Sequence, residues 1–189
     1  AQCTRTVVGF NTCLCAYAAQ GDIHKSYQLF KQMKEDGLQP DVVTYNALLN
    51  ACANSHKQQR QTHGNPQNTT AHKMRKQQGN HDHSQNSKTM FEIAMRVFKL
   101  LKNDERVVQD HVTFGTLLKV GGSLLPPGSE EQEMFITRVV RMATQECSSM
   151  GLTPTFWRIL KNLVTPALYQ KLIEEDRIFR QTDSKRIPI

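Results

Sequence analysis

Apolar residues near the start of the chain recur with helical spacing in two short segments. The first segment carries Phe10, Leu14 and Tyr17, and the second carries Ile23, Tyr27, Phe30 and Met33. Spacings of three and four residues place such side chains on one face of a helix. A Gly-Asp pair at 21–22 separates the segments, and Gly37 followed by Pro40 ends the second one. The pattern predicts a helix, a tight turn and a second helix, a hairpin that buries its apolar face only when copies stack.

The opening of this hairpin recurs further along the chain. Residues 42–46 repeat the β-branched, aromatic and amide pattern of residues 7–11 at an offset of 35 residues, and residues 111–115 repeat most of it again. The Gly-Leu-Gln-Pro ending at 37–40 returns as Gly-Leu-Thr-Pro at 151–154. Repetition at such a period is typical of a solenoid. We therefore predict an all-α protein, an α-solenoid of stacked helix–turn–helix hairpins.

The repeat boundaries predict the domain organisation. Repeats are expected over residues 7–165, with units at 7–41, 42–110 and 111–155 and a partial unit at 156–165. In the third unit, Gly121-Gly122 predicts the end of the first helix, and the next helix is expected to begin near Phe156. Residues 166–189 are expected to form a terminal helix that closes the stack and a basic tail that starts near Arg180.

A polar stretch at about 55–88, rich in Gln, Asn, His and Lys, interrupts the second unit. Comparison with the first unit places it in the turn between the two helices of the hairpin, where a solenoid tolerates extra chain. Because so few apolar residues cannot offset the entropy lost on ordering, we predict disorder there. Its basic residues either contact phosphates or only keep the stretch soluble, and the sequence leaves both readings open.

Composition narrows the class of partner. The net charge of +7 favours a polyanion, with nucleic acid ahead of an acidic membrane surface. No apolar run is long enough to span a bilayer, so no membrane partner is expected. The five cysteines are odd in number and scattered, which predicts buried thiols in a reducing compartment. Most of the seven histidines lie in or beside the polar stretch, and neither a metal site nor a cofactor is expected.

No catalytic constellation is recognisable in the sequence. It has no Gly-rich phosphate loop, no acidic cluster suited to a metal-dependent nuclease and no Cys/His signature of a zinc deaminase. The acidic runs at 130–131 and 174–176 are typical of solvated helix faces. We therefore expect a binding protein and not an enzyme, with no catalytic residues.

The repeat resembles a known family. Val-Val-Thr-Tyr-Asn-Ala-Leu-Leu at 42–49 resembles the opening of a pentatricopeptide repeat, and Tyr-Gln-Leu-Phe-Lys-Gln-Met-Lys-Glu-Asp-Gly-Leu-Gln-Pro-Asp at 27–41 resembles its second half. The nearest rival, the protein-binding tetratricopeptide repeat, has a period of about 34 residues, so the offset of 35 favours the pentatricopeptide family. The resemblance spans about residues 7–163 without the polar stretch, and the third unit is degenerate.

This resemblance implies that the first helices line a concave surface and that each repeat reads about one base of single-stranded RNA. In the family, the fifth and the last residue of a repeat select the base, and Asn with Asp favours uracil. The residues at these positions are Asn11 with Asp41 and Asn46 with Asp110. An Asn amide offers a donor and an acceptor to a base edge, and an acceptor-only Asp can hold that amide in one orientation. Both residue types also cap helices, so capping is an alternative that can coexist with base reading.

The second residue of each repeat packs against the bases in this family. The residues expected at this stacking position are Val8, Val43, Val112 and Trp157. In the third unit the selecting pair is Gly115 with Thr155, which departs from the base-reading pattern. The large ring of Trp157 suits stacking on a last base.

By this resemblance, the expected function is single-stranded RNA binding in RNA processing, stability or translation in a mitochondrion or plastid. Two uracil-selecting repeats supply only about 1–3 kcal/mol each, so we expect missing upstream repeats or a helper protein. No targeting segment is visible in the sequence. The alternatives are a tetratricopeptide-like scaffold for proteins, and the RNA-binding arm of a nuclease such as protein-only RNase P whose catalytic domain is absent.

Overall fold

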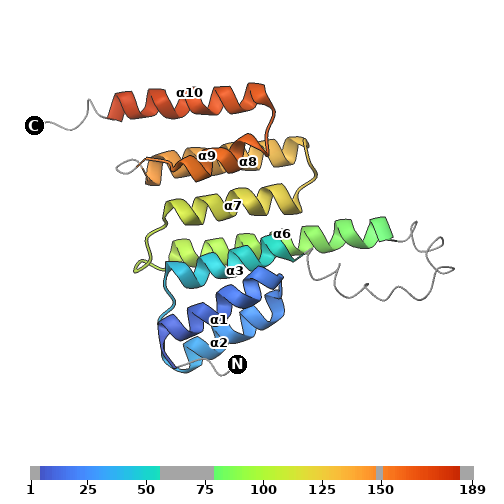
Figure 1. Cartoon of the computed structure of the whole chain (residues 1–189), viewed down its shortest axis with the longest axis vertical. Helices are drawn as coiled ribbons and strands as arrows, with labels where there is room; N and C mark the ends of the chain where they lie inside the picture. The colour runs from blue at the N-terminus through green and yellow to red at the C-terminus, as the bar shows by residue number, and fades with distance from the viewer. Residues whose placement is uncertain (1–4, 56–78, 148–150, 184–189) are drawn as a thin grey trace, which may run out of the picture. The chain divides into compact units, whose positions relative to one another are not determined.

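The computed structural model describes residues 5–55, 79–147 and 151–183, and within these ranges the chain is α-helical without strands. In chain order the helices are α1 (Val7–Gln20), α2 (Ile23–Glu35), α3 (Val42–Asn54), α6 (Gly79–Asn103), α7 (His111–Leu124), α8 (Glu130–Glu146), α9 (Pro154–Lys161) and α10 (Pro166–Asp183) (Figure 1). The all-α prediction is confirmed, and the helices follow one another as antiparallel hairpins of a helical repeat.

The helices fall into two compact units that divide after Val107. In the first unit α1 packs against α2 and α3, and α3 packs against α6. In the second unit α7 packs against α8 and α9, and α10 packs against both α8 and α9. Each unit is therefore a pair of hairpins in which the first helices of neighbouring hairpins lie side by side.

A polar side chain begins the first helix of every hairpin. Thr6, Asp41, Asp110 and Thr153 each accept a hydrogen bond from the backbone N–H three residues ahead. At Asp41 and Asp110 the third helical residue is a Thr whose hydroxyl accepts in return, which completes a capping box. These caps give the four first helices a common register, counted below from the cap.

The turn inside the first hairpin depends on a glycine. Gly21 ends α1 in the left-handed conformation, with φ of 75°. A Cβ there would clash with the backbone carbonyl of Asn54 at the end of α3. The Asn54 amide in turn donates to the Ala18 carbonyl oxygen at 3.0 Å. Only glycine therefore permits both the turn and this close approach of α3.

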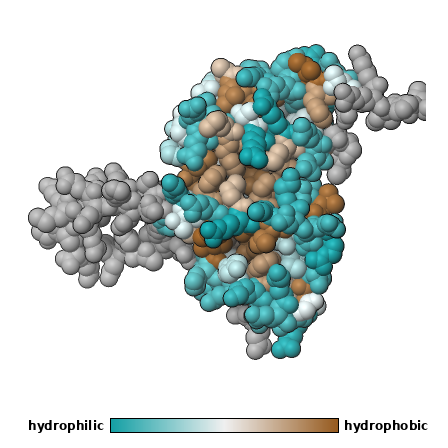
Figure 2. All heavy atoms as spheres, turned by 180° about the vertical axis from the view of Figure 1, so that it is seen from behind, coloured by the Kyte–Doolittle hydropathy of each residue, from teal (hydrophilic) through white to brown (hydrophobic). Residues whose placement is uncertain are grey.

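Apolar side chains from facing helices fill the core of each unit. The largest fully buried ones are Phe10, Leu14, Met33, Leu48, Leu49 and Leu101 in the first unit and Phe114, Leu117, Leu118, Ile136, Phe156 and Leu160 in the second. Hydrophilic residues cover most of the face drawn in Figure 2, and apolar side chains reach the surface between them. The helical spacing of apolar residues thus correctly predicted the burial of Phe10, Leu14, Phe30 and Met33, whereas Tyr27, predicted on the same face as Phe30, is 50 % exposed.

The polar stretch was predicted to be disordered through residue 88, but α6 already begins at Gly79. Residues 56–78 lie outside the described ranges. The later turns of α6 are anchored by Ala94, Val97 and Leu101, which are buried. Once those turns are packed, extending the helix backwards avoids the cost of nucleation, and polar residues can continue it. The prediction of disorder used composition alone and did not consider that α6 could extend backwards from its packed turns.

The structure of the second unit differs from the sequence prediction at four points. Gly121-Gly122 does not end the first helix, because α7 continues to Leu124, which is buried. The next helix begins at Pro154 and not near Phe156. The segment predicted as a terminal helix is α10, which packs against α9 as the second helix of a fourth hairpin. Arg180, predicted to start the basic tail, lies within α10 and pairs with Asp176 at 2.8 Å.

The cysteines partly contradict the sequence prediction. Cys13 is disulfide-bonded, whereas Cys15, Cys52 and Cys147 are free thiols. Cys52 is buried, and desolvation raises the pKa of its thiol to about 12. In the described ranges no group of three His, Cys, Asp or Glu side chains is arranged to hold a metal ion. No helix there has the length and apolarity that a membrane span requires.

Candidate nucleic-acid interface

The structure brings Asn11 and Asp41 together across the boundary between the first two hairpins. The Asn11 side-chain nitrogen donates to both carboxylate oxygens of Asp41, at 3.0 and 3.1 Å. Asn11 lies in the second turn of α1, and Asp41 is the cap of α3. These residues are 30 positions apart in the sequence. They meet because α1 and α3 pack side by side.

A third residue, Thr44, completes the cluster. Its hydroxyl oxygen lies 2.7 Å from the Asn11 side-chain carbonyl oxygen and 3.0 Å from the nearer Asp41 oxygen. A hydroxyl has one hydrogen, and the shorter distance favours donation to Asn11. The Asp41 backbone N–H donates to the same hydroxyl at 3.1 Å. Neither this capping box nor the contact of Thr44 with Asn11 was predicted from the sequence.

These contacts fix the orientation of the Asn11 amide. An ionised carboxylate only accepts hydrogen bonds, so it must face the amide nitrogen. Thr44 then meets the amide oxygen as a donor. Asn11 is held on both sides and is only 8 % exposed, so its remaining hydrogen-bonding capacity points in a defined direction. The cluster is an oriented amide that can meet a planar partner edge-on.

Capping and side-chain pairing coexist at Asp41. Its Oδ1 accepts from the Thr44 backbone N–H at 2.9 Å, which caps α3, while the same carboxylate holds Asn11. The sequence left these roles as alternatives. The geometry shows that one carboxylate makes both sets of contacts.

Two valines lie close to the oriented amide. Val8 precedes Asn11 by three residues on α1, which places both on one helix face, and it is 75 % exposed. Val43 is the neighbour of Thr44 at the start of α3 and is 45 % exposed. Exposed valines in consecutive first helices, with a polar group between them, are suited to hold a flat apolar ring.

The second predicted pair is divided between the two units. Asn46 lies in α3 of the first unit, where it is buried. Asp110 caps α7 of the second unit, and its Oδ1 accepts from the Thr113 backbone N–H at 2.8 Å. Val112 is 48 % exposed, and its role in stacking stays a prediction. Each residue is in the predicted place on its own helix, and their pairing with each other stays a prediction.

Comparison with known proteins agrees with this repeat geometry. The model of the PPR (pentatricopeptide) repeat family matches residues 5–54, the stretch that contains α1, α2 and α3. Residues 5–54 therefore belong to the pentatricopeptide repeat family.

Three Arabidopsis thaliana relatives illustrate the similarity. Pentatricopeptide repeat-containing protein At1g05750, chloroplastic, is 43 % identical over 49 residues, which are 26 % of this chain and 10 % of the relative. The relative At1g14470 is 46 % identical over 48 residues, which are 25 % and 9 % of the two chains. DOT4, chloroplastic, is 41 % identical over 48 residues, which are 25 % and 6 %. The chain thus spans a tenth or less of the length of each relative, and no solved structure matches it.

The fourth pentatricopeptide-type hairpin has a different register from the one predicted. The cap of α9 is Thr153, so Thr155 is the second helical residue and Trp157 the fourth. Val8, Val43 and Val112 are second helical residues, so Trp157 does not occupy their position. Its ring instead makes edge contacts with Phe156 and with Tyr169 of α10. The prediction aligned the two prolines Pro40 and Pro154, but α9 begins earlier relative to its proline than α3 does.

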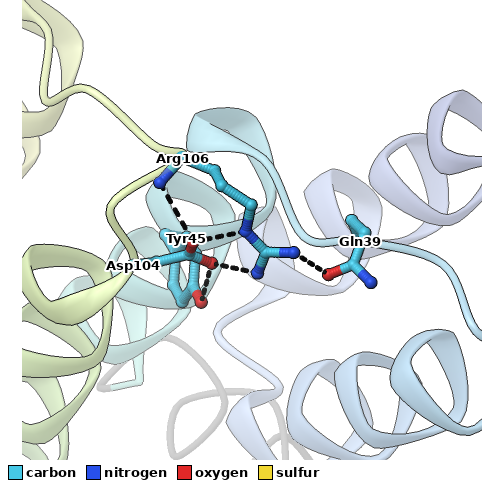
Figure 3. Close-up of polar contacts among 4 residues, drawn as sticks. All are labelled: Gln39, Tyr45, Asp104 and Arg106. Carbon is cyan, nitrogen blue, oxygen red and sulfur yellow. Dashed lines mark hydrogen bonds and ion pairs between the residues drawn. The ribbon is translucent and has the colours of Figure 1, made fainter.

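A polar cluster that the sequence did not reveal closes the second pentatricopeptide hairpin. Arg106 donates to both carboxylate oxygens of Asp104, at 2.9 and 3.0 Å, and also to the Gln39 side-chain oxygen at 2.5 Å (Figure 3). The Tyr45 hydroxyl lies 3.4 Å from the same carboxylate. The hydrogen bond from Arg106 holds the pKa of Asp104 below its usual value. The cluster joins the end of α6 to the linker at 37–40 that precedes Asp41. The second helix of the first hairpin ends differently, in a turn at Gly37 with φ of 74°.

Proposed function

We propose that this chain binds single-stranded RNA and that the first repeat favours uracil. The observation that carries the proposal is the Asn11 amide, oriented by Asp41 and Thr44 between two exposed valines. With its nitrogen facing Asp41, the Asn11 carbonyl oxygen keeps a lone pair for a donor. Uracil offers such a donor, its N3–H, between two carbonyl groups. By family resemblance, the second repeat would use Asn46 with Asp110 in the same way.

The proposed role in the cell is RNA processing, stability or translation in a mitochondrion or plastid. Two of the relatives carry the word chloroplastic in their names, which supports an organelle without deciding which one. The net charge of +7 favours association with a polyanion. Stacking and edge contacts contribute about 1–3 kcal/mol per base, so two reading repeats give weak binding. A helper protein or further repeats would then supply the rest of the affinity.

Binding of labelled U-rich and A-rich oligomers to the whole chain tests the proposal. We expect measurable binding to U-rich RNA that weakens with salt, and a preference of at least several-fold over A-rich RNA. Equal and negligible binding to both oligomers would refute RNA binding. Capture of a peptide in place of RNA would favour the protein scaffold.

A substitution at the cap sharpens the test. Asp41→Asn keeps a residue that caps helices well but adds donors opposite Asn11, so the amide loses its imposed orientation. We expect the preference for uracil to fall while the fold is retained. Asp22→Asn is the matched control, because Asp22 caps α2 in the same manner and makes the same change of charge. If both variants alter base preference equally, the assignment to Asn11 and Asp41 is wrong.

A further inference from the structure

The start of the third hairpin has a hollow in the place where the first hairpin has its oriented amide. It lies between α7 and α9 and has a volume of about 260 Å³. Val112, Gly115 and Lys119 line it from α7, and Thr153, Thr155 and Ile159 line it from the cap and first turns of α9. All of these residues belong to the second unit. The hollow is thus formed within one compact part of the chain.

The hollow exists because Gly115 has no side chain. Gly115 is the fifth residue after the cap Asp110, as Asn11 is the fifth residue after the cap Thr6. A Cβ built on Gly115 would meet no atom within 4 Å. The neighbouring helix has therefore not moved in to fill the gap. The third hairpin therefore has open space at the position where the first hairpin has the Asn11 amide.

Besides His111 and Lys119, the polar side chains that line the hollow are threonines, whose hydroxyls can adapt. Thr116 donates its hydrogen to the Val112 carbonyl oxygen at 2.8 Å, so its own oxygen remains an acceptor. Thr153 accepts from the Phe156 backbone N–H at 3.3 Å, so its hydroxyl hydrogen remains a donor. Thr155 is exposed. Hydroxyls rotate and serve in both roles, so these threonines favour no single pattern of donors and acceptors.

A positive charge stands next to the hollow. Lys119 is exposed and follows Gly115 by four residues, which places it on the same face of α7 one turn further on. The equivalent positions, nine residues after the cap, are Cys15 in α1 and Asn50 in α3. The third hairpin therefore loses an amide and gains an ammonium group on one face. A base seated against Val112 would have its phosphate within reach of a flexible lysine.

From this combination we infer that the hollow between α7 and α9 seats one nucleotide of the RNA without selecting its base. The space at Gly115 admits purines and pyrimidines, the threonine hydroxyls adapt to either, and Lys119 holds the phosphate. This inference rests on the proposed function, because it needs RNA to reach the chain. The hollow would then contribute to RNA affinity in a repeat that lacks the family's base-selecting residues.

Oligomers that differ by one nucleotide test the inference. We would compare binding of the two-uracil core with cores extended by U, C, A or G at either end. One of the two extensions should tighten binding by roughly tenfold, with a spread among the four bases of less than about threefold. A strong preference for one base would overturn the tolerance. No gain from any extension, with the core still bound, would overturn the inference alone, whereas absence of all RNA binding would overturn the proposed function too.

Variants of the hollow itself give a second readout. Gly115→Leu should fill it and abolish the gain from the extra nucleotide, while Gly115→Ala should keep most of that gain. Lys119→Gln should weaken binding of all four extended oligomers alike and lower the salt dependence by about one phosphate contact. Lys171→Gln, the same change at an exposed site on α10, is the control and should do neither. Retained gain in Gly115→Leu, with helical content unchanged, would contradict the assignment.

Discussion

The first and third hairpins present the same face in two chemically different forms. At the first, Asn11 is held by Asp41 and Thr44 and is nearly buried. At the third, Gly115 leaves a hollow of about 260 Å³, lined by hydroxyls and flanked by Lys119. Both faces begin with an exposed valine as the second helical residue, Val8 and Val112. The repeat scaffold is shared, and the two faces differ in the residue five positions after the cap, which is Asn11 in one and Gly115 in the other.

The difference between the two hairpins separates the features that build the fold from those that are proposed to contact a base. The caps, the apolar spacing and the packing of first helices against each other persist in both units. The polar cluster of Asn11, Asp41 and Thr44 lies at the first hairpin boundary, whereas Gly115 stands in the position of Asn11 in the third hairpin. If the proposed function holds, a degenerate repeat keeps its architecture while it changes from reading a base to accommodating one.

The largest expected effect separates a cap that holds a partner from a cap alone. Asp41→Ala removes the cap of α3, at about 1 kcal/mol, and leaves the Asn11 amide without its acceptor, at about 1 kcal/mol more. Thr153→Ala removes only the cap contact to Phe156, at about 1 kcal/mol. Urea denaturation should show Asp41→Ala to be the more destabilising by roughly a factor of two. Equal losses would mean that the Asn11 contact contributes no net stability.

Two glycines of α7 differ in the room that each leaves for a side chain, and substitutions there test whether the hollow is open. Gly121→Ala places a Cβ 2.7 Å from the Phe135 ring on α8, and such overpacking costs about 1–3 kcal/mol. Gly115→Ala meets nothing within 4 Å and should stabilise the helix by about 0.5–1 kcal/mol. Denaturation midpoints should therefore move in opposite directions. A loss of stability in Gly115→Ala would show that the hollow is not open.

Thr44 tests whether orientation, and not mere presence, of the Asn11 amide confers selectivity. Thr44→Val keeps the shape but removes the donor to Asn11, whereas Thr44→Ser keeps the hydroxyl. We expect the ratio of binding constants for uracil over cytosine at the first repeat to fall several-fold in Thr44→Val and to persist in Thr44→Ser. Both variants change packing at a buried site, so unfolding free energies are measured alongside. An unchanged ratio in Thr44→Val would limit Thr44 to capping.

The sequence predicted the scaffold well because the scaffold depends on local signals. Apolar spacing, Gly37 and the caps act within a few residues of where they stand, so α1, α2 and α3 were anticipated. The third and fourth hairpins were harder, since Gly121 is a packing glycine inside α7 and not a breaker. That role depends on Phe135 of another helix, which no local pattern reveals.

The residues of the candidate site were likewise predictable only in part. Family resemblance identified Asn11 and Asp41, and the structure shows their contact. Thr44 as a partner of Asn11 and the hollow at Gly115 depend on neighbouring helices, so the sequence could not supply them. The register of Trp157 was lost because the cap of α9, and not its proline, sets the start of that helix.

The smallest expected effect concerns the cluster that closes the second hairpin, and it depends on pH. The pKa of Asp104 is lowered in the folded chain, so its interaction with Arg106 stabilises the fold above the unfolded pKa and is lost as the pH falls through the folded one. Arg106→Gln should therefore unfold slightly more easily than the parent at pH 7, with the difference vanishing once the pH falls below the lowered pKa of Asp104. Arg96→Gln, an exposed change on α6, should show no such pH-dependent difference. Because Arg106 is largely exposed, salt should also shrink the effect, and a difference that persists at acidic pH would assign it to packing and not to the ion pair.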